Sequence, residues 1–337
     1  MDNVAHTLTA VALSQAGFNR KTRFATLALI LAANIPDVDI VTSFASSATY
    51  LKYHRGLTHS ILGATVLAGI VTAVIYLWGG RAAPPKKKDA APLDLRWLAL
   101  AAWVGAASHL ALDLTNSYGV RLLDPFSGRW FAWDIMYIVD PLLLLILAVA
   151  LGAPLLFRVI SEEVGARKPG FQKGAIAALC GMAALWGLRG FAHARVISLL
   201  DSHSYYQEDP ERLAAFPTPL NPFQWTGVAE TESAIHVLPV NALDSDVDME
   251  RDRVFHKPDS SPALTIATKT PTAQAFFDFA RFPWAEVEDA DDGYDVRILD
   301  LRFYSGARGG QPFTVEIRLD KNLQILSDSF SFIGKGD

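Results

Sequence analysis

Seven ionisable side chains lie in stretches of sequence that are otherwise almost entirely apolar. They are His6, Asp37, Asp39, His59, His109, Asp113 and Asp140. Ionisable side chains are costly to place in a membrane, so they usually mark a functional site. Histidine and carboxylate ligands without cysteine suit a divalent ion such as zinc, manganese or iron. The residue types therefore predict a metal site, with zinc as the first choice.

Helical spacing indicates which of these residues act together. His109 and Asp113 are four residues apart, so on a helix they share one face. Three of these residues lie 13 or 14 residues from a basic residue in one of the predicted cytoplasmic turns, in the pairs His6 and Arg20, Asp37 and Arg23, and His109 and Arg96. At about 1.5 Å per residue, the three ligand-type residues share one depth, roughly 20 Å from the basic residues. We predict five metal ligands: His6, Asp37, His59, His109 and Asp113.

Other polar residues are assigned supporting roles. The segment His54-Arg55-Gly56-Leu57-Thr58-His59-Ser60 places His54 and Arg55 at the mouth of the predicted pocket, where a guanidinium can clamp a phosphate or carboxylate. We predict that these two residues steady the substrate and that Asp39 acts as a general base or bridges a second ion. Asp134 and Asp140 are predicted to orient ligands from outside. The remaining histidines are isolated in the sequence and are predicted at the surface or an interface: His193, His203, His236 and His256.

The elements that must position these residues are membrane helices. Crossing the ~30 Å hydrocarbon layer takes about 20 helical residues, and four apolar runs are long enough: 60–79, 97–116, 138–157 and 174–192. Two shorter runs precede them, at 4–18 and 24–41, and the second is interrupted by Pro36 and two aspartates. We predict an all-α, polytopic membrane domain of about five to six helices over residues 1–200.

Composition separates this domain from the rest of the chain. With 51% hydrophobic residues, 19% charged residues and a mean hydropathy of +0.21, the chain is too apolar for disorder or for nucleic-acid binding by bulk charge. Residues 1–200 carry a net charge of +7, whereas residues 201–337 carry −12. The acidic part is therefore predicted to face water.

The C-terminal part has the pattern of short strands and turn-forming residues that is typical of a small soluble domain. Short β-like stretches separated by glycine, proline and aspartate predict strands at 234–240, 263–268, 294–304, 312–319 and 323–333. A short helix is predicted at 273–281. Residues 217–337 are thus expected to form a small α+β domain.

The distribution of basic residues predicts the orientation in the membrane. Twelve lysines and arginines fall in three turns on one side of the predicted spans: Arg20, Lys21, Arg23, Arg81, Lys86, Lys87, Lys88, Arg96, Arg158, Arg167, Lys168 and Lys173. Basic loops remain in the cytoplasm. The site and the C-terminal domain are therefore predicted on the extracytoplasmic side of the plasma (inner) membrane.

These motifs together resemble a known family. Their types and order are similar to those of the LexA-regulated, membrane-bound family of metal-dependent hydrolases. The motifs that carry the resemblance are Val4-Ala5-His6, Asn34-Ile35-Pro36-Asp37-Val38-Asp39, His54 to Ser60, His109-Leu110-Ala111-Leu112-Asp113, Asn116 to Gly119, Trp133-Asp134 and Asp140-Pro141. The resemblance covers most of residues 1–145 and implies an integral membrane protein whose histidines and aspartates bind divalent metal. A looser similarity to zinc-dependent phospholipase C and P1-type nucleases implies a phosphate-ester substrate, although the full histidine set of a trinuclear zinc site is absent.

The preferred interpretation is a metal-dependent hydrolase acting on a phosphate ester or a lipid-linked substrate. The partners expected are the lipid bilayer and such a substrate, and no nucleic acid. Two alternatives remain open. The same histidines and aspartates could relay protons in a transporter or carrier, against which no inverted repeat is visible. The helices could also be a non-catalytic anchor for the C-terminal domain. The absence of an HExxH motif counts against a zincin-type protease.

Overall fold

The computed structural model describes residues 1–81, 91–163, 170–304 and 312–332, with the backbone alone for 159–163. The chain divides into two compact units. The first contains Met1–Val38, Arg55–Phe191 and Pro219–Pro222, and the second contains Asp39–His54, Ala192–Thr218 and Phe223–Asp337. The sequence analysis placed the division between residues 200 and 217. In the structure the main boundary between the two units lies between Phe191 and Ala192, and the second unit also includes residues 39–54.

The first unit is helical. Its helices are α1 (Asn3–Ala16), α2 (Ala25–Ala32), α4 (Ile61–Arg81), α5 (Leu95–Thr115), α6 (Pro141–Glu163) and the first part of α7 (Phe171–Asp201). By length and composition, five segments of the described chain can cross a membrane: Ala25–Phe44, Ile61–Arg81, Leu95–Thr115, Pro141–Arg158 and Phe171–Asp201. The predicted helical membrane domain is confirmed. Five of the basic residues that predict its orientation lie outside the described residues: Lys86, Lys87, Lys88, Arg167 and Lys168.

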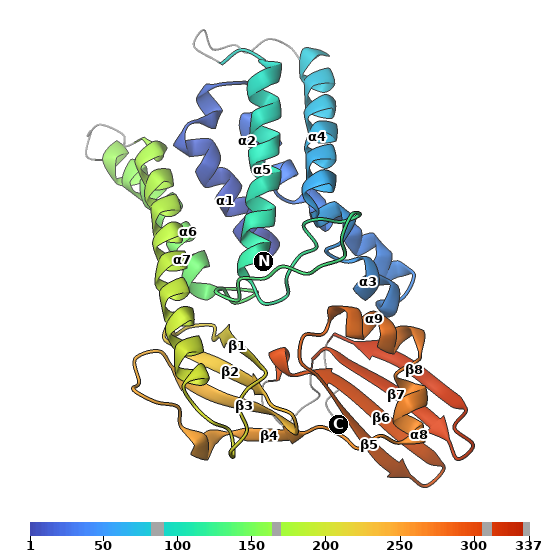
Figure 1. The fold of residues 1–337 in the computed structure, drawn as a ribbon. Coiled ribbons are helices and arrows are strands. Elements are labelled where there is room, and N and C mark those ends of the chain that lie inside the picture. The colour runs from blue at the N-terminus through green and yellow to red at the C-terminus, as the bar shows by residue number, and fades with distance from the viewer. Residues whose placement is uncertain (82–90, 164–169, 305–311, 333–337) are drawn as a thin grey trace. The chain divides into compact units, whose positions relative to one another are not determined.

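Small side chains let these helices approach closely. Helix α5 runs alongside α2 and α4 (Figure 1), and most buried residues of this core are alanines from all three helices and α1. Small residues at helix contacts are typical of membrane bundles. A Cβ atom at Gly105 would lie 2.7 Å from the carbonyl oxygen of Leu29, so this contact between α5 and α2 requires glycine.

The break predicted near Pro36 is present and has a local cause. Helix α2 ends at Ala32, and the chain continues as the 3₁₀ helix η2 (Ile35–Phe44). A proline cannot donate the hydrogen bond that would continue an α-helix. Asn34 fills the break, donating from Nδ2 to the Ile30 carbonyl at 2.8 Å and to Thr7 Oγ1 at 3.1 Å. The turn thereby carries Asp37 away from the axis of α2.

The second unit is a two-sheet α/β domain. One antiparallel sheet contains β1 (Arg212–Pro217), β2 (Gln224–Glu230), β3 (Ala234–Asn241) and β4 (Arg253–His256) in sequence order. The other contains β5 (Pro283–Ala290), β6 (Gly293–Asp300), β7 (Thr314–Asp320) and β8 (Ile325–Ser331) in the same manner. The remaining helices of this unit are α3 (Ser47–Tyr53), α8 (Pro262–Ala267) and α9 (Pro271–Phe279). Buried residues of both sheets share one core.

Most of the predicted elements of this domain are present, and one is wrong. The strands predicted at 234–240, 294–304, 312–319 and 323–333 correspond to β3, β6, β7 and β8, and the predicted helix is α9. The strand predicted at 263–268 is helix α8. Ser261 caps this helix by accepting a hydrogen bond from the Leu264 backbone at 3.1 Å, and Pro262 occupies its first turn. These start signals outweigh the β-like composition.

Candidate metal centre

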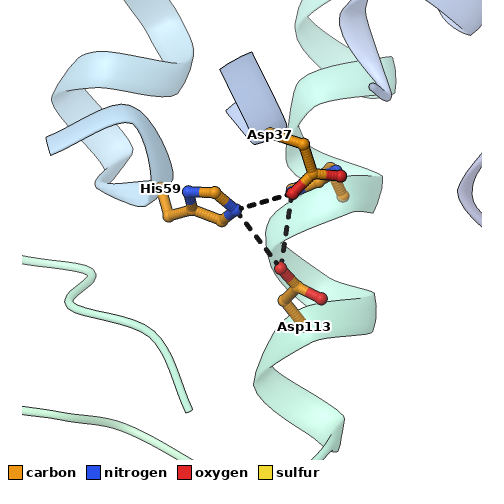
Figure 2. A group of neighbouring side chains, drawn as sticks. Asp37, His59 and Asp113 are labelled. Carbon is orange, nitrogen blue, oxygen red and sulfur yellow. Dashed lines mark hydrogen bonds and ion pairs between the residues drawn. The ribbon is translucent and has the colours of Figure 1, made fainter. Parts of the chain in front are cut away.

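Four side chains from three separate segments of the first unit meet in a buried cluster. They are Asp37, His59, His109 and Asp113, and one potential ligand atom from each lies within 4.8 Å of all the others. We call them the His/Asp cluster. Three of the side chains are fully buried, and that of Asp37 is 22% exposed. Figure 2 shows Asp37, His59 and Asp113 pointing toward one another.

The nitrogen-to-oxygen distances in this cluster resemble one another. His59 Nε2 lies 3.2 Å from Asp37 Oδ1 and 3.5 Å from Asp113 Oδ2. His109 Nε2 lies 3.7 Å from Asp37 Oδ1 and 3.4 Å from Asp113 Oδ2. Four ligands at about 2.0–2.2 Å from a tetrahedral zinc ion lie roughly 3.3–3.6 Å from one another. These distances therefore fit the edges of a zinc coordination shell and are mostly long for direct hydrogen bonds.

Close packing fixes the segments that carry the ligands. His109 and Asp113 lie one turn apart on α5, and His59 ends the short 3₁₀ helix η3 (Leu57–His59). Glycine is required where η3 meets the first turn of α4, because a Cβ atom at Gly63 would lie 1.8 Å from the Leu57 carbonyl oxygen. The η3 turn can therefore lie directly against α4, which brings the His59 imidazole toward α5.

Hydrogen bonds orient both imidazoles of the cluster. His109 Nδ1 lies 2.8 Å from the Ala33 carbonyl oxygen, which can only accept. The proton of a neutral His109 is therefore on Nδ1, and Nε2 presents a lone pair to the cluster. His59 Nδ1 lies 3.1 Å from Thr58 Oγ1, which likewise leaves Nε2 facing the carboxylates. Such partners are typical of metal-binding histidines.

His6, the fifth predicted ligand, lies at the edge of the cluster. Its Nε2 atom is 3.5 Å from Asp113 Oδ1. Its ring stacks on that of His109, with 4.0 Å between centroids. The residue is fully buried, and neither ring nitrogen has a hydrogen-bond partner within the described chain. His6 is therefore available as a further ligand or as a wall of the site.

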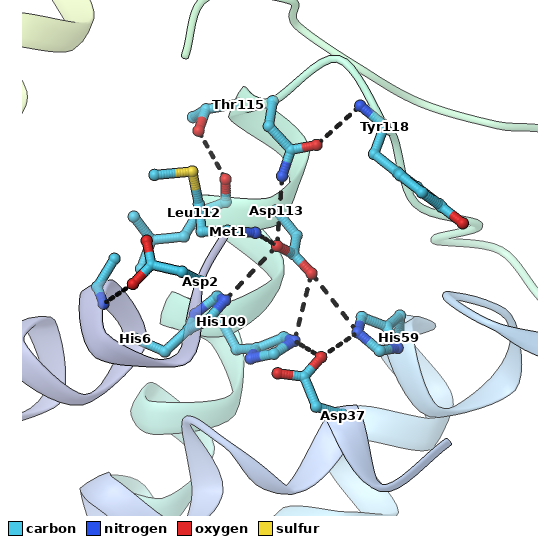
Figure 3. A network of polar contacts seen from close by, with 12 residues as sticks. Met1, Asp2, His6, Asp37, His59, His109, Leu112, Asp113, Thr115 and Tyr118 are labelled. Carbon is cyan, nitrogen blue, oxygen red and sulfur yellow. Dashed lines mark hydrogen bonds and ion pairs between the residues drawn. The ribbon is translucent and has the colours of Figure 1, made fainter. Parts of the chain in front are cut away.

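Positive groups surround the carboxylate of Asp113. The Arg55 guanidinium lies 3.1 Å from Asp113 Oδ1 and donates to Asn116 Oδ1 and the Gly119 carbonyl, each at 3.2 Å. Arg55 is 5% exposed and has a left-handed backbone, with φ 56°. The amino group of Met1 also contacts Asp113 Oδ1, and Figure 3 shows Met1, His6 and His109 converging on this side chain. Arg55 thus lies within the site rather than at its mouth.

Buried polar atoms without hydrogen-bond partners indicate whether these residues could bind a metal ion. Within the described part of the chain, Asp37 Oδ2, Asp113 Oδ2 and His109 Nε2 are buried without a hydrogen-bond partner. A buried polar atom without a partner costs about 1–3 kcal/mol. A divalent cation among the ligand atoms would satisfy several of them at once. The donor set and these orphaned atoms therefore fit a metal ion.

The other predicted site residues make contacts of their own. Asp39 and His54 both belong to the second unit and pair with each other, Oδ1 to Nδ1 at 3.1 Å. Asp140 is fully buried, pairs with Arg189 at 3.0 Å and caps α6 by accepting from the Leu143 backbone. Asp134 is buried in the loop between α5 and α6, with φ 56°.

Sequence reasoning missed several contributors to the site. Thr58 and the Ala33 carbonyl orient the histidines, and Asn116 links Arg55 to Asp113 through both ends of its amide. The motif that contains Asn116 was noticed in the sequence, but only the helix end shows that it faces Asp113. His236, predicted at the surface or an interface, is 2% exposed and bonds Asp252 at 2.6 Å.

Comparisons with known proteins match both parts of the chain. Residues 1–196 match the family model described as YdjM inner membrane protein, and residues 262–335 match the YfhP C-terminal alpha/beta plait domain. A relative, "Uncharacterized protein YfhP" of Bacillus subtilis (strain 168), is 24% identical over 312 residues, covering 91% of this chain and 85% of the relative. No solved structure matches the chain.

Proposed function

Because the chain belongs to the YdjM inner membrane protein family, we propose that its His/Asp cluster is the metal centre of a membrane-embedded hydrolase. The observation that supports this most strongly is the convergence of four ligand-type atoms within 4.8 Å, on helices whose packed core is apolar. Ionisable groups kept in such surroundings are usually functional. The resemblance to metal-dependent hydrolases supplies the reaction class.

The residues divide into holding and supporting roles. Asp37, His59, His109 and Asp113 would hold the ion, with His6 beside them. A divalent ion there would supply a nucleophile from water at neutral pH and polarise the oxygen of the scissile bond. Asp37 Oδ2 is buried without a hydrogen-bond partner within the described chain, so this atom would be able to accept a proton beside the ion.

A phosphate ester or lipid-linked substrate agrees with this setting. The cluster lies at the C-terminal end of α5, so a substrate that remains in the bilayer can present its polar group there. Arg55 neutralises part of the negative charge that Asp113 adds to the site. This reduces the repulsion that an anionic substrate would meet.

The orientation is a separate part of the proposal. His109 and Asp113 lie at the opposite end of α5 from Arg96, which precedes Trp97 in its first turn. If the basic turns follow the positive-inside rule, the cluster would lie on the extracytoplasmic side. A reporter that is active only in the cytoplasm, fused after residue 337, should be inactive. Activity there would reverse the orientation.

Metal analysis of the purified full chain tests the proposal. The wild type should bind zinc, manganese or iron stoichiometrically, and His109→Ala and Asp37→Ala should each abolish this binding. His203→Ala is the matched control, because His203 belongs to the second unit and contacts Asp246 at 3.6 Å. All variants must first elute as monodisperse, folded protein. Full metal content in folded His109→Ala and Asp37→Ala would refute the metal centre.

Activity separates a hydrolase from the remaining alternatives. A proton relay needs no stoichiometric ion, and an anchor needs no turnover. Metal-loaded wild type should release product from phosphodiester or phospholipid substrates, whereas His109→Ala should not. Stoichiometric metal with no turnover on either substrate class would reduce the centre to a structural role.

A further inference from the structure

A second feature of α5 lies beside the His/Asp cluster. Helices α4 and α5 enclose an apolar groove with a cavity volume of about 300 Å³, lined among others by Ile61, Ala64, Trp103, Ala107, Leu110 and Leu114. We call it the α4–α5 groove. Its one side-chain hydroxyl, that of Thr65, donates to the Ile61 carbonyl at 2.7 Å. The lining therefore offers a ligand only hydrocarbon contacts, in a volume at the lower end of small-molecule sites.

The groove follows the same turns of α5 as the cluster. Leu110 follows His109, and Leu114 follows Asp113. With 3.6 residues per turn, residues three apart, such as Leu110 and Asp113, are separated by about 60° around the helix axis. The groove thus occupies the face of α5 next to the one that carries the ligands.

One loop connects the two features at their polar end. Leu122 lines the groove, and its carbonyl oxygen accepts a hydrogen bond from the Ile61 backbone at 3.0 Å. The preceding residue, Arg121, donates its backbone N–H to the Arg55 carbonyl at 3.1 Å. The loop that closes the groove therefore also holds the segment that places Arg55 against Asp113.

The length and surroundings of the groove indicate its occupant. From Trp103 to Leu114 the lining spans 12 residues of α5, which puts the two ends about 16 Å apart. One leaflet contributes about half of the ~30 Å hydrocarbon layer, so the groove is as long as one leaflet is deep. Its floor is buried, with Ala64 at 3% exposure, whereas the rim residues Ile61 and Trp103 are exposed on helices that span the membrane.

We propose that the α4–α5 groove binds one acyl chain of a glycerophospholipid substrate, with the phosphate ester directed toward the His/Asp cluster. The inference rests on the proposed hydrolase function and specifies its substrate class. Glycerophospholipid chains are the hydrocarbon that the bilayer presents to this face, and each chain spans one leaflet. The groove selects a lipid by its tail, while the cluster acts on its head.

Lipid binding to the full chain in detergent tests the proposal, with dioleoyl phosphatidylglycerol as the probe and native mass spectrometry as the measurement. Ala107→Phe and Ala111→Phe fill the groove and should weaken binding by about tenfold or more, as expected from excluding roughly two methylene groups. Ala99→Phe makes the same change at an exposed position of α5 outside the groove and should bind as the wild type does. Trp103→Ala, which removes an exposed rim, should also weaken binding and serves if the larger side chains prevent folding.

The same samples separate this inference from the proposed function. Groove variants should keep the wild-type metal content while losing lipid. Unchanged lipid affinity in Ala107→Phe, Ala111→Phe and Trp103→Ala would overturn the groove. Preferential binding of undecaprenyl phosphate over phosphatidylglycerol would overturn the acyl-chain assignment. The wild type could bind no metal while the groove variants still bind less lipid than the wild type does. That result would support lipid binding in the groove and refute the metal centre.

Discussion

The second unit buries a complete ion pair, whereas the first buries an incomplete one. Both oxygens of Asp300 accept backbone hydrogen bonds, from Arg281 at 3.1 Å and Arg302 at 3.0 Å. The Arg302 guanidinium donates to Asp300 at 2.7 Å and to the Phe279 carbonyl at 2.9 Å. In the His/Asp cluster, by contrast, Asp113 Oδ2 and His109 Nε2 face each other at 3.4 Å without a hydrogen bond.

The contrast indicates different roles for the Asp300–Arg302 pair and the His/Asp cluster. A pair whose hydrogen bonds all come from the protein contributes to folding and leaves no coordination position for a ligand. Within the described chain, two histidines and two aspartates leave nitrogen or oxygen atoms unsatisfied: His6, His109, Asp37 and Asp113. These atoms keep their bonding capacity for a ligand that arrives after folding. The first arrangement is suited to stability, and the second is suited to binding a cation.

The largest expected effect comes from breaking the complete pair. Arg302→Leu leaves the Asp300 carboxylate buried without its partner, so unfolding of the second unit should become easier by about 3–5 kcal/mol. Thermal unfolding of the full chain in detergent measures this. Arg297→Leu is the control, because Arg297 is 49% exposed and lies 3.7 Å from Glu286. Equal destabilisation by both substitutions would show that the buried pair has no special role.

A divalent cation bound at the His/Asp cluster should stabilise the first unit. At a free zinc concentration of about 100 times the dissociation constant, the first unit should gain roughly 2.7 kcal/mol of stability. Unfolding with zinc and with a chelator, followed separately for the two units by limited proteolysis, measures the gain. His109→Ala should not respond, and the second unit should be unaffected in every sample. Equal protection of both units by zinc would contradict a localised site.

A smaller effect is expected from the residues that orient the ligands. Thr58→Val removes the hydroxyl beside His59 Nδ1 and should lower metal affinity by about tenfold without changing the stoichiometry. Thr72→Val on α4 is the matched control, since the Thr72 hydroxyl donates only within its own helix, to Ala68 at 2.8 Å. Metal titration followed by calorimetry gives both values. Identical affinities would exclude orientation by Thr58.

The smallest effect belongs to an exposed pair of the second unit. The hydrogen bond from Arg318 to Asp292, at 3.0 Å, holds the pKa of Asp292 below its ordinary value. The pair therefore stabilises the fold above the pKa of an unfolded aspartate, and this contribution is lost as the pH falls through the folded pKa. Arg318→Met should raise the pKa of Asp292 toward its ordinary value with little change in stability. An NMR titration of the carboxyl group measures the shift, and a constant pKa would refute the coupling.

Sequence patterns were sufficient to select the residues of the His/Asp cluster, because charge in an apolar run is rare. Helical spacing alone paired His109 with Asp113, and depth along the predicted helices grouped His6, Asp37 and His109. The structure brings four of the five predicted ligands within 4.8 Å and puts His6 beside them. These inferences needed only the helix period and the cost of burying charge.

The sequence was less informative where contacts between distant parts of the chain determine the position of a residue. The approach of Arg55 to Asp113 depends on a left-handed backbone and on the loop that contains Asn116, and neither follows from the pattern around residue 55. Strands β1, β2, β4 and β5 were also missed, although each of them pairs with a strand that is its neighbour along the chain. His236 looked isolated because Asp252 lies 16 residues away, on the other side of the turn to β4.

The two neighbouring faces of α5 have a consequence for how this protein can vary in length. One face carries His109 and Asp113, and the next carries Leu110 and Leu114, so both depend on the same rotational phase of one helix. A one-residue insertion between Gly105 and His109 would turn everything after it by about 100° relative to Gly105's contact with α2. Insertions and deletions among homologues are therefore expected on either side of α5 and not within it.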